Sequence, residues 1–491
     1  MKKDRVWNYA RWGLCLCLFG IFLAWSMMQP FGAPPDEAER YKITAYIVKH
    51  GTLPHGGDPE IMLDGWGFSY GFQPILPYIL SAYFVRFVSL FTSSEYVILI
   101  AARMVSVMTG VVMAAIVWKL SEKLFREKST ALLFAFLVCL LPQCMFMHTY
   151  VNVDSMALMS SALIVYSWVI GLESGWNTKS CCFLGVGMGL CAMSYYDAYG
   201  FLLCSIFVFL SSFIHYDRRE KKLRIEWKEL LKKGFLAGGI AFLIAGWWFI
   251  RSAVLYDGDF LGLRTRDAYA EKYAAKHLKP SMAPTWHNAG FSIIDMLRQS
   301  DYLNLLTKSF VGMFEHMKLP LPDWMYRIYF AVLGLGLLFA VFPMRKRKAL
   351  KLQKKRIVFH MSMIACILIP NWLCLWAAYD VDYQPQGRYI LPMIIPFMYY
   401  VTLGFRKLLN PLFEGGHEKA ANGILYGLCA LLAAVMLLML WKVIYTKYYY
   451  NFITMLKSDW RTFFRKKNRT MSIYHRHKNN FRIFRKNKNI I

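Results

Sequence analysis

The sequence predicts an all-α membrane protein that crosses the bilayer many times. Its 491 residues are 57% apolar and 18% charged, whereas soluble chains carry about 25% charged residues. Too few polar side chains are present to cover a soluble domain, so a cytosolic globular enzyme and a disordered chain are excluded. We therefore expect a polytopic bundle of about 11–13 transmembrane helices, with two long outer loops that carry short interfacial helices.

The formal net charge of +28 does not indicate a nucleic-acid binder, because the positive residues are concentrated. Residues 344–356 hold eight Lys and Arg with no acidic residue, and residues 446–491 hold 13 against one Asp. Basic blocks between apolar stretches usually face the cytoplasmic leaflet of a membrane. We therefore expect a multi-pass protein of the plasma membrane, in contact with the lipid bilayer and not with nucleic acid.

Twelve apolar stretches are candidate spans, because about 20 apolar residues cross the hydrocarbon core. They are residues 12–28, 74–91, 95–118, 131–149, 155–171, 180–194, 198–214, 234–250, 326–342, 357–378, 390–405 and 422–445. The first is interpreted as an uncleaved signal anchor, since it follows a basic N-terminus. All eleven cysteines lie in apolar runs, which predicts small buried side chains rather than disulfides or a zinc module.

The number of crossings follows from the basic connections, which are expected inside. These connections are residues 119–128, 218–233, 345–356 and 406–419. The stretch 74–91 contains Pro74, Pro77 and Arg86, which favours an interfacial helix over a full crossing. Eleven full spans then remain.

That count places five polar segments outside, namely 29–73, 150–154, 195–197, 251–325 and the turn at 379–389. It also divides the chain into a transmembrane catalytic module at 1–445 and a basic, aromatic tail at 446–491. The tail then falls outside, against the positive-inside rule. Polar groups gathered on one face are typical of an enzyme at a membrane surface, whereas carriers place them at mid-membrane.

The first outer loop contains the first candidate catalytic residues. Pro34 and Pro35 precede Asp36 and Glu37, so the acidic pair is expected to open a helix near its positive end. Asp36 and Arg40 lie four residues apart and share a helix face, while Glu37 points elsewhere. One interpretation is a capped interfacial helix with a surface ion pair. The other is a general base with an arginine beside it for an anionic group.

Short elements spread over about residues 30–400 resemble the GT-C superfamily of integral-membrane glycosyltransferases, notably the protein O-mannosyltransferases and the lipid A aminoarabinose transferases. They are Asp36-Glu37 with Arg40-Tyr41, Tyr70-x-x-Gln73-Pro74-x-x-x-Tyr78, Asn152-x-Asp154-Ser155, Trp247-Trp248-x-x-Arg251 and Gln386-Gly387-Arg388-Tyr389-x-Leu391-Pro392. A further segment, Ser309-Phe310-x-Gly312-Met313-Phe314 followed by Pro320-Leu321-Pro322, resembles an uncharacterised bacterial branch of that superfamily.

The resemblance implies an inverting transfer of a sugar from a polyprenyl phosphate or diphosphate to a glycan, lipid or protein acceptor. The reaction would take place on the extracytoplasmic face. By the same resemblance Asp36 is the general base, with Glu37 as its helper. Asp154 is the second catalytic acid, and Asn152 positions it.

Three arginines are expected to bind the donor phosphate, because a guanidinium group forks onto phosphate oxygens and each lies at the outer end of a span. They are Arg388, Arg251 and Arg40. The alternative is that each arginine only snorkels to the interface. The supporting residues are Tyr70, Gln73, Gln386 and Tyr389.

Other polar groups of the outer segments carry weaker signals. A divalent cation at His50, His55, Asp58 and Glu60 is an alternative to a reaction without cofactor, although their spacing matches no defined site. Asp197 lies in an outer turn where GT-C relatives often have a lysine, and its role stays open. The 251–325 loop, with nine basic and eight acidic residues, is long enough to act as a lid.

Other functional classes remain as alternatives to sugar transfer. A polytopic transporter or lipid flippase would carry ionisable residues deep in the spans and inverted repeats. An O-antigen polymerase or ligase-like enzyme shares a large outer loop and arginines, without the Asp-Glu pair. A structural membrane protein without chemistry is the last alternative.

Overall fold

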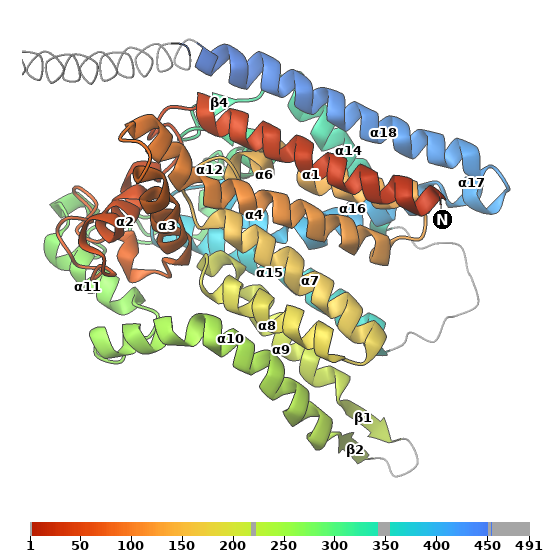
Figure 1. The fold of residues 1–491 in the computed structure, drawn as a ribbon, viewed down its shortest axis with the longest axis horizontal. Coiled ribbons are helices and arrows are strands. Elements are labelled where there is room, and N and C mark those ends of the chain that lie inside the picture. Colours follow the sequence, from red (N-terminus) through yellow and green to blue (C-terminus); the bar gives the residue numbers. More distant parts are fainter. Residues whose placement is uncertain (1, 218–221, 342–353, 450–452, 454–491) are drawn as a thin grey trace, which may run out of the picture.

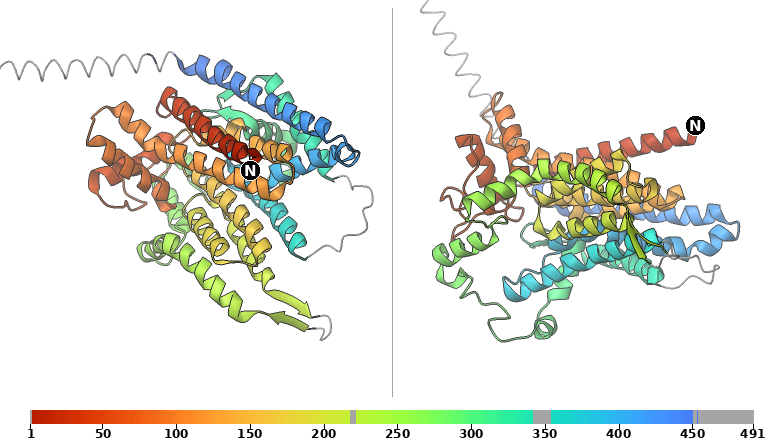
Figure 2. Two further views of the ribbon diagram at one scale, coloured as in Figure 1. Left: turned by 45° about the vertical axis from the view of Figure 1, so that its right-hand side comes forward. Right: turned by 90° about the horizontal axis from the view of Figure 1, so that it is seen from below.

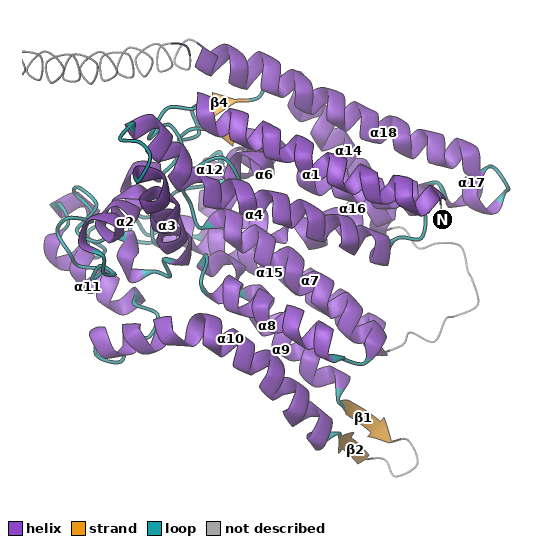
Figure 3. Cartoon of the chain, viewed as in Figure 1, coloured by secondary structure: helices purple, strands orange, loops and turns teal. Residues whose placement is uncertain are grey.

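The computed structural model describes residues 2–217, 222–341, 354–449 and 453, and it consists almost wholly of helices (Figures 1 and 3). Within these residues, eight helical segments are long and apolar enough to cross a membrane. They are α1 (Lys2–Met28), α4 (Glu95–Leu124), α7 (Asp154–Ser174), α10 (Trp227–Leu255), α14 (Asp323–Val341), α15 (Lys354–Asp380), η4 (Gly387–Met393) with α16 (Ile394–Leu408), and α18 (Glu418–Met439) with η5 (Leu440–Tyr445).

Shorter apolar helices lie among the long helices of the bundle. They are α5 (Lys128–Cys139) continued by α6 (Pro142–Met147), α8 (Thr178–Ala192) and α9 (Gly200–Ser212). The expected span 131–149 is therefore broken before Pro142, because a proline is best tolerated in the first turn of a new helix. The predicted multi-pass helical fold is confirmed.

The two long polar loops fold into short helices at one end of the bundle, called the loop end here (Figures 1 and 2). The first loop carries α2 (Glu37–His50), η1 (Tyr70–Phe72) and α3 (Leu76–Ser89). The second carries α11 (Leu263–Tyr273), η3 (Lys276–Leu278), α12 (Ile293–Gln299), α13 (Tyr302–Gly312), β3 (Met313–Phe314) and β4 (Leu319–Pro320). Helix α3 packs beside α2, and its Arg86 donates to the Ile47 carbonyl of α2.

The opposite end, called the basic end here, carries the N-terminus and the shorter connections (Figure 1). A hairpin of β1 (Ile214–Asp217) and β2 (Lys222–Ile225), which the sequence analysis missed, pairs Ile214 with Ile225 before α10 begins. Helix α17 (Asn410–Glu414) links α16 to α18 at this end, while η2 (Tyr196–Ala198) lies at the loop end between α8 and α9.

The last described helix returns to the loop end. The Tyr448 hydroxyl donates to Glu315, in the turn between β3 and β4, over 3.0 Å. This helix therefore ends on the same side of the bundle as the two long loops. Most of the 446–491 tail lies outside the described residues.

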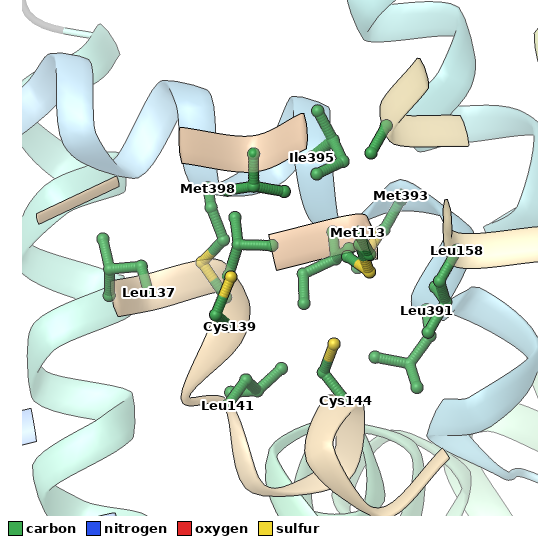
Figure 4. Packing of buried hydrophobic residues seen from close by; sticks show 14 of the residues in the cluster. Met113, Leu137, Cys139, Leu141, Cys144, Leu158, Leu391, Met393, Ile395 and Met398 are labelled. Atoms are coloured by element: carbon green, nitrogen blue, oxygen red, sulfur yellow. The ribbon is translucent and has the colours of Figure 1, made fainter. Parts of the chain in front are cut away.

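The core of the bundle is built from aliphatic, methionine and cysteine side chains. Figure 4 shows Met113, Cys139, Cys144, Leu391 and Met398 packed together; they come from α4, α5, α6, η4 and α16. All eleven cysteines are free and nine of them are buried, so they act as small apolar side chains.

Helices α14 and α16 approach each other so closely that only glycine fits at their crossing. A Cβ on Gly404 would lie 1.7 Å from the Gly336 carbonyl oxygen. Small residues at such crossings let helix backbones pack closely in a membrane, where lipid tails remove the usual hydrophobic driving force.

We expect Gly404→Ala to lower the free energy of unfolding by about 1–3 kcal/mol, because the added methyl group forces the two helices apart. Thermal unfolding in detergent measures the change. Gly427→Ala on α18 is the matched control, since no atom lies within 4 Å of its Cβ position. Equal unfolding temperatures for Gly404→Ala and the unaltered protein would contradict this account of the crossing.

Candidate active site

Asp36 is placed by the turn that opens helix α2. Asp36 follows Pro34 and Pro35 directly and takes the N-cap position of α2 with a φ of 59°. This left-handed backbone is costly for a residue with a Cβ and persists only where the surrounding structure enforces it. Arg40 follows one turn later and donates its backbone N–H to the Asp36 carbonyl. The acidic pair therefore opens a helix, as expected.

Arg388 reaches the same point from the other end of the chain. Gly387 lets η4 press against α13, because a Cβ there would lie 2.1 Å from the Phe310 backbone nitrogen. The Arg388 side chain is 4% exposed, and its Nη2 donates to Asp36 Oδ2 over 2.7 Å. The same Nη2 donates to the Tyr389 hydroxyl over 3.0 Å, and the guanidinium group lies over the Tyr389 ring.

Asp154 completes a chain of alternating charges. It is the first residue of α7, and its Oδ2 accepts from Arg40 Nη1 over 2.8 Å. Arg40 Nη2 also lies 3.5 Å from Asp36 Oδ2. Asp154, Arg40, Asp36 and Arg388 thus form one contact network, called the acid–arginine cluster here. The structure brings together the residues on which the sequence-based hypothesis depends.

Two further expected residues support the cluster. Asn152 Oδ1 accepts from the Ser155 backbone N–H, and its Nδ2 donates to the Met147 and Tyr150 carbonyls. These bonds hold the first turn of α7 and so position Asp154. The Tyr70 ring lies 5.2 Å from the Arg40 guanidinium carbon, in a cation–π contact.

Several buried donors in the cluster have no partner among the described residues. They are Nε and Nη1 of Arg388 and Nε of Arg40. Buried N–H groups are normally hydrogen-bonded, so their orphaned state calls for an explanation. Guanidinium donors that converge in a shielded site are suited to an oxyanion such as phosphate.

The charge of Asp36 is set by its two arginines. Burial raises the pKa of this carboxyl, but Arg388 and then Arg40 outweigh burial and hold the pKa at about 2. Asp36 is therefore ionised at neutral pH but weakly basic while Arg388 holds it. An anion that took Arg388 away from Asp36 would make the carboxylate a stronger base.

Glu37 lies apart from the cluster. Its carboxylate forms a bidentate ion pair with Arg103 of α4, at 2.7 and 2.6 Å, and both side chains are fully buried. It also accepts from the Gly32 and Val151 backbone N–H groups. These contacts occupy both oxygens, so we propose that Glu37 braces the loop rather than helping Asp36 in the chemistry.

Arg103 joins this brace to the first helix. Its Nη1 donates to the Ser26 and Gln29 carbonyls at the end of α1. One buried guanidinium group therefore ties the end of α1, the start of α2 and α4 together. Its position inside an apolar stretch was a detectable signal, because an ionisable residue in a span rarely lacks a role.

A comparison with protein families identifies the chain. The family described as a predicted membrane protein (DUF2142) matches residues 63–397 of the chain. The chain belongs to this family. The matched region contains Asp154 and Arg388 and begins after Asp36. No curated protein matches the chain significantly in sequence.

Two solved structures are similar to this DUF2142 protein. The crystal structure of the Archaeoglobus fulgidus oligosaccharyltransferase with Zn and sulfate superposes with a TM-score of 0.50 and 14% identity, over 85% of this chain and 52% of that one. The crystal structure of ArnT from Cupriavidus metallidurans bound to undecaprenyl phosphate superposes with a TM-score of 0.47 and 12% identity, over 91% of this chain and 75% of that one. This chain spans about half the length of the oligosaccharyltransferase. The first likeness confirms the GT-C fold that the motif order suggested.

Other residues expected at the site of the DUF2142 protein lie outside the cluster. Arg251 donates to the Pro54 carbonyl over 2.7 Å and lies over the Trp248 ring, so its contacts hold the first loop. Gln73 ends η1 through its backbone bond to Tyr70. The Gln386 side chain donates to the Gln384 amide oxygen, which also accepts from the Tyr389 hydroxyl. Because Arg388 donates to that hydroxyl, Gln386 supports Arg388 only indirectly.

His316 is a neighbour of Asp36 that sequence reasoning missed. It lies at the tip of the turn between β3 and β4, near enough to contribute to lowering the pKa of Asp36. Its neighbours Glu315 and Met317 both have left-handed backbones, with φ of 56° and 58°. No sequence pattern signals this turn, because its position depends on how the 251–325 loop folds.

The four residues considered for a divalent cation do not converge. His50 pairs with Glu60 over 2.8 Å, while His55 contacts the Phe72 and Tyr256 rings. Asp58 caps the turn before Glu60 through the Glu60 backbone N–H. In the part of the chain that the structure describes, no group of three or more His, Cys, Asp or Glu could hold a metal ion.

We expect Glu37→Gln to lower the free energy of unfolding by about 3–5 kcal/mol, because it leaves the Arg103 charge buried and uncompensated. Thermal unfolding and the yield of folded protein measure this. Glu60→Gln is the control, since its pair with Lys49 is exposed and is worth about 0–1 kcal/mol. A Glu37→Gln protein of normal stability that had lost turnover would instead assign Glu37 to the chemistry.

Proposed function

We propose that this DUF2142 protein is an inverting membrane glycosyltransferase that uses a sugar linked to a polyprenyl phosphate or diphosphate. The single observation that carries the proposal is the acid–arginine cluster at the loop end of a GT-C fold. A carboxylate is held there by an arginine that retains two unpartnered donors. This pairing supplies the base and the anion site that the transfer needs, in direct contact with each other.

The chemistry follows from that contact. The donor phosphate binds the free donors of Arg388 and competes with Asp36 for Nη2. Asp36, released from this arginine, accepts the proton of an acceptor hydroxyl. The acceptor oxygen then attacks the anomeric carbon opposite the phosphate, and the bond between that carbon and the phosphate oxygen breaks. The lipid phosphate leaves with the electron pair, stabilised by Arg388.

Asp154 and Arg40 hold the other half of this arrangement. Arg40 bridges Asp154 to Asp36 and keeps the base oriented after Arg388 turns to phosphate. The unpartnered Asp154 Oδ1 faces a site where positive charge develops on the sugar ring. Asp154 is therefore proposed to stabilise the transition state rather than to remove the proton.

The reaction is proposed to take place on the extracytoplasmic face of the plasma membrane. The basic connections 119–128 and 406–419 belong to the opposite end of the bundle, which the positive-inside rule places in the cytoplasm. A transporter or flippase is less well supported, because the cluster lies where loops meet helices and not at mid-bundle. The acceptor is proposed to be a glycan, lipid or protein that reaches this face.

We expect Asp36→Asn to reduce kcat by about a hundredfold to ten-thousandfold, because the amide cannot accept the acceptor proton. Affinity for the donor should be kept, since Arg388 is no longer paired to a charge. Transfer from a polyprenyl-phosphate sugar by the purified protein measures both. Asp64→Asn is the matched control, an exposed aspartate of the same loop. Undiminished turnover by Asp36→Asn would refute the assignment of the base.

We expect Arg388→Ala to weaken binding of the donor lipid about tenfold to a hundredfold, the loss of one or two charge-assisted hydrogen bonds. Arg388→Lys should recover only part of the affinity, because an ammonium group cannot fork onto phosphate. Lipid binding is measured by titration of the purified proteins. Arg298→Ala, an exposed arginine of α12, is the control. Unchanged affinity in Arg388→Ala would leave this residue with a structural role only.

A further inference from the structure

A partly buried carboxyl group that the mechanism above does not use lies on a segment packed against the cluster. Asp197 belongs to η2, which packs against η4, α15 and the start of α7. The Tyr196 hydroxyl anchors this turn by donating to the Leu261 carbonyl over 2.7 Å. Asp197 Oδ2 is buried and has no hydrogen-bond partner within the described chain. An orphaned carboxyl oxygen in a polar site points to a ligand or to a bound proton.

The groups that face Asp197 favour a bound proton. Burial, and then the negative charge of Asp154, raise the pKa of Asp197 to about 8, although Arg388 lowers it. The other titratable groups within electrostatic reach are Tyr195 in its own turn, Tyr389 of η4 and Cys374 of α15. None of these three carries a positive charge, so Arg388 is the one cation acting on Asp197 among the described residues. Asp197 is therefore mostly protonated at neutral pH.

The charge balance of the cluster explains why a protonated Asp197 suits an anion site. Asp36 and Asp154 neutralise Arg40 and Arg388, so the four side chains together carry no net charge. An ionised Asp197 would add a negative charge facing an incoming phosphate. A protonated Asp197 adds instead a hydrogen-bond donor on η2, which packs against η4, the segment that carries Arg388 and its free Nε and Nη1.

We propose that Asp197 binds the donor lipid as a neutral carboxylic acid, its O–H donating to a phosphate oxygen held by Arg388. The proposal rests on the proposed function, since it deepens the donor site of that enzyme. Only the protonated form binds, so donor affinity is kept below the pKa of Asp197 and is lost as the pH rises through about 8.

The test uses the full-length protein in detergent and a probe of fixed charge. Farnesyl methyl phosphate, a prenyl phosphodiester, keeps one negative charge over the working range. The unaltered protein should bind it about tenfold more weakly at pH 9 than at pH 7, the ratio of protonated Asp197 at the two pH values. Asp197→Asn should bind it with nearly equal affinity at both, because the amide N–H stays a donor. Asp64→Asn should keep the tenfold difference.

The outcomes separate this proposal from the proposed function. Binding by the unaltered protein that does not change with pH, or an Asp197→Asn protein that keeps the difference, overturns the role of Asp197 and leaves the glycosyltransferase standing. If farnesyl methyl phosphate does not bind at any pH, or if Arg388→Ala binds it as tightly as the unaltered protein does, the donor site is overturned and this proposal with it. The infrared band of a protonated carboxyl at pH 7, absent from Asp197→Asn, checks the proton without ligand, and its absence from the unaltered protein overturns the proposal.

Discussion

The pairing of buried charges is the constraint on which the rest of this structure depends. Arg388 and Arg40 are almost completely buried, and a buried guanidinium group is tolerated only with carboxylate partners. Their partners come from segments far apart, since Arg388 and Asp36 are separated by 352 positions in the chain. Each ion pair therefore also sets the relative position of the first loop, the start of α7 and η4. The same contacts that hold these elements together assemble the candidate active site.

The neighbouring acids Asp36 and Glu37 show how one step along the chain separates two roles. Asp36 is the left-handed N-cap and Glu37 is the first residue of α2, so the two side chains leave the backbone in different directions. Glu37 turns into the bundle toward Arg103, where it is fully buried and fully bonded. Asp36 remains a quarter exposed, on the side of Arg388 and His316. A motif of two acids thus combines a structural brace with a carboxylate free to react, and the brace keeps the strained Asp36 turn in place.

In the cluster without ligand, the ion pair with Arg388 lowers the basicity of Asp36. An ionised carboxylate with a pKa of about 2 is a weak proton acceptor. Under the proposed mechanism the donor phosphate competes with Asp36 for Arg388, so base strength rises only when donor is present. This coupling would protect the donor site from reacting with the wrong partner, because anion binding and proton removal share one arginine.

The sequence by itself determined the class of the fold, the long apolar spans and the order of the GT-C elements. These follow from composition and from the lengths of apolar stretches, which act locally on a chain in lipid. Only the tertiary structure decided that Arg388 and not Arg251 meets Asp36, that Glu37 pairs with Arg103, and that Asp197 and His316 lie beside the cluster. Such contacts depend on how loops fold against distant helices, and no local pattern encodes which of several arginines at span ends will face a given carboxylate.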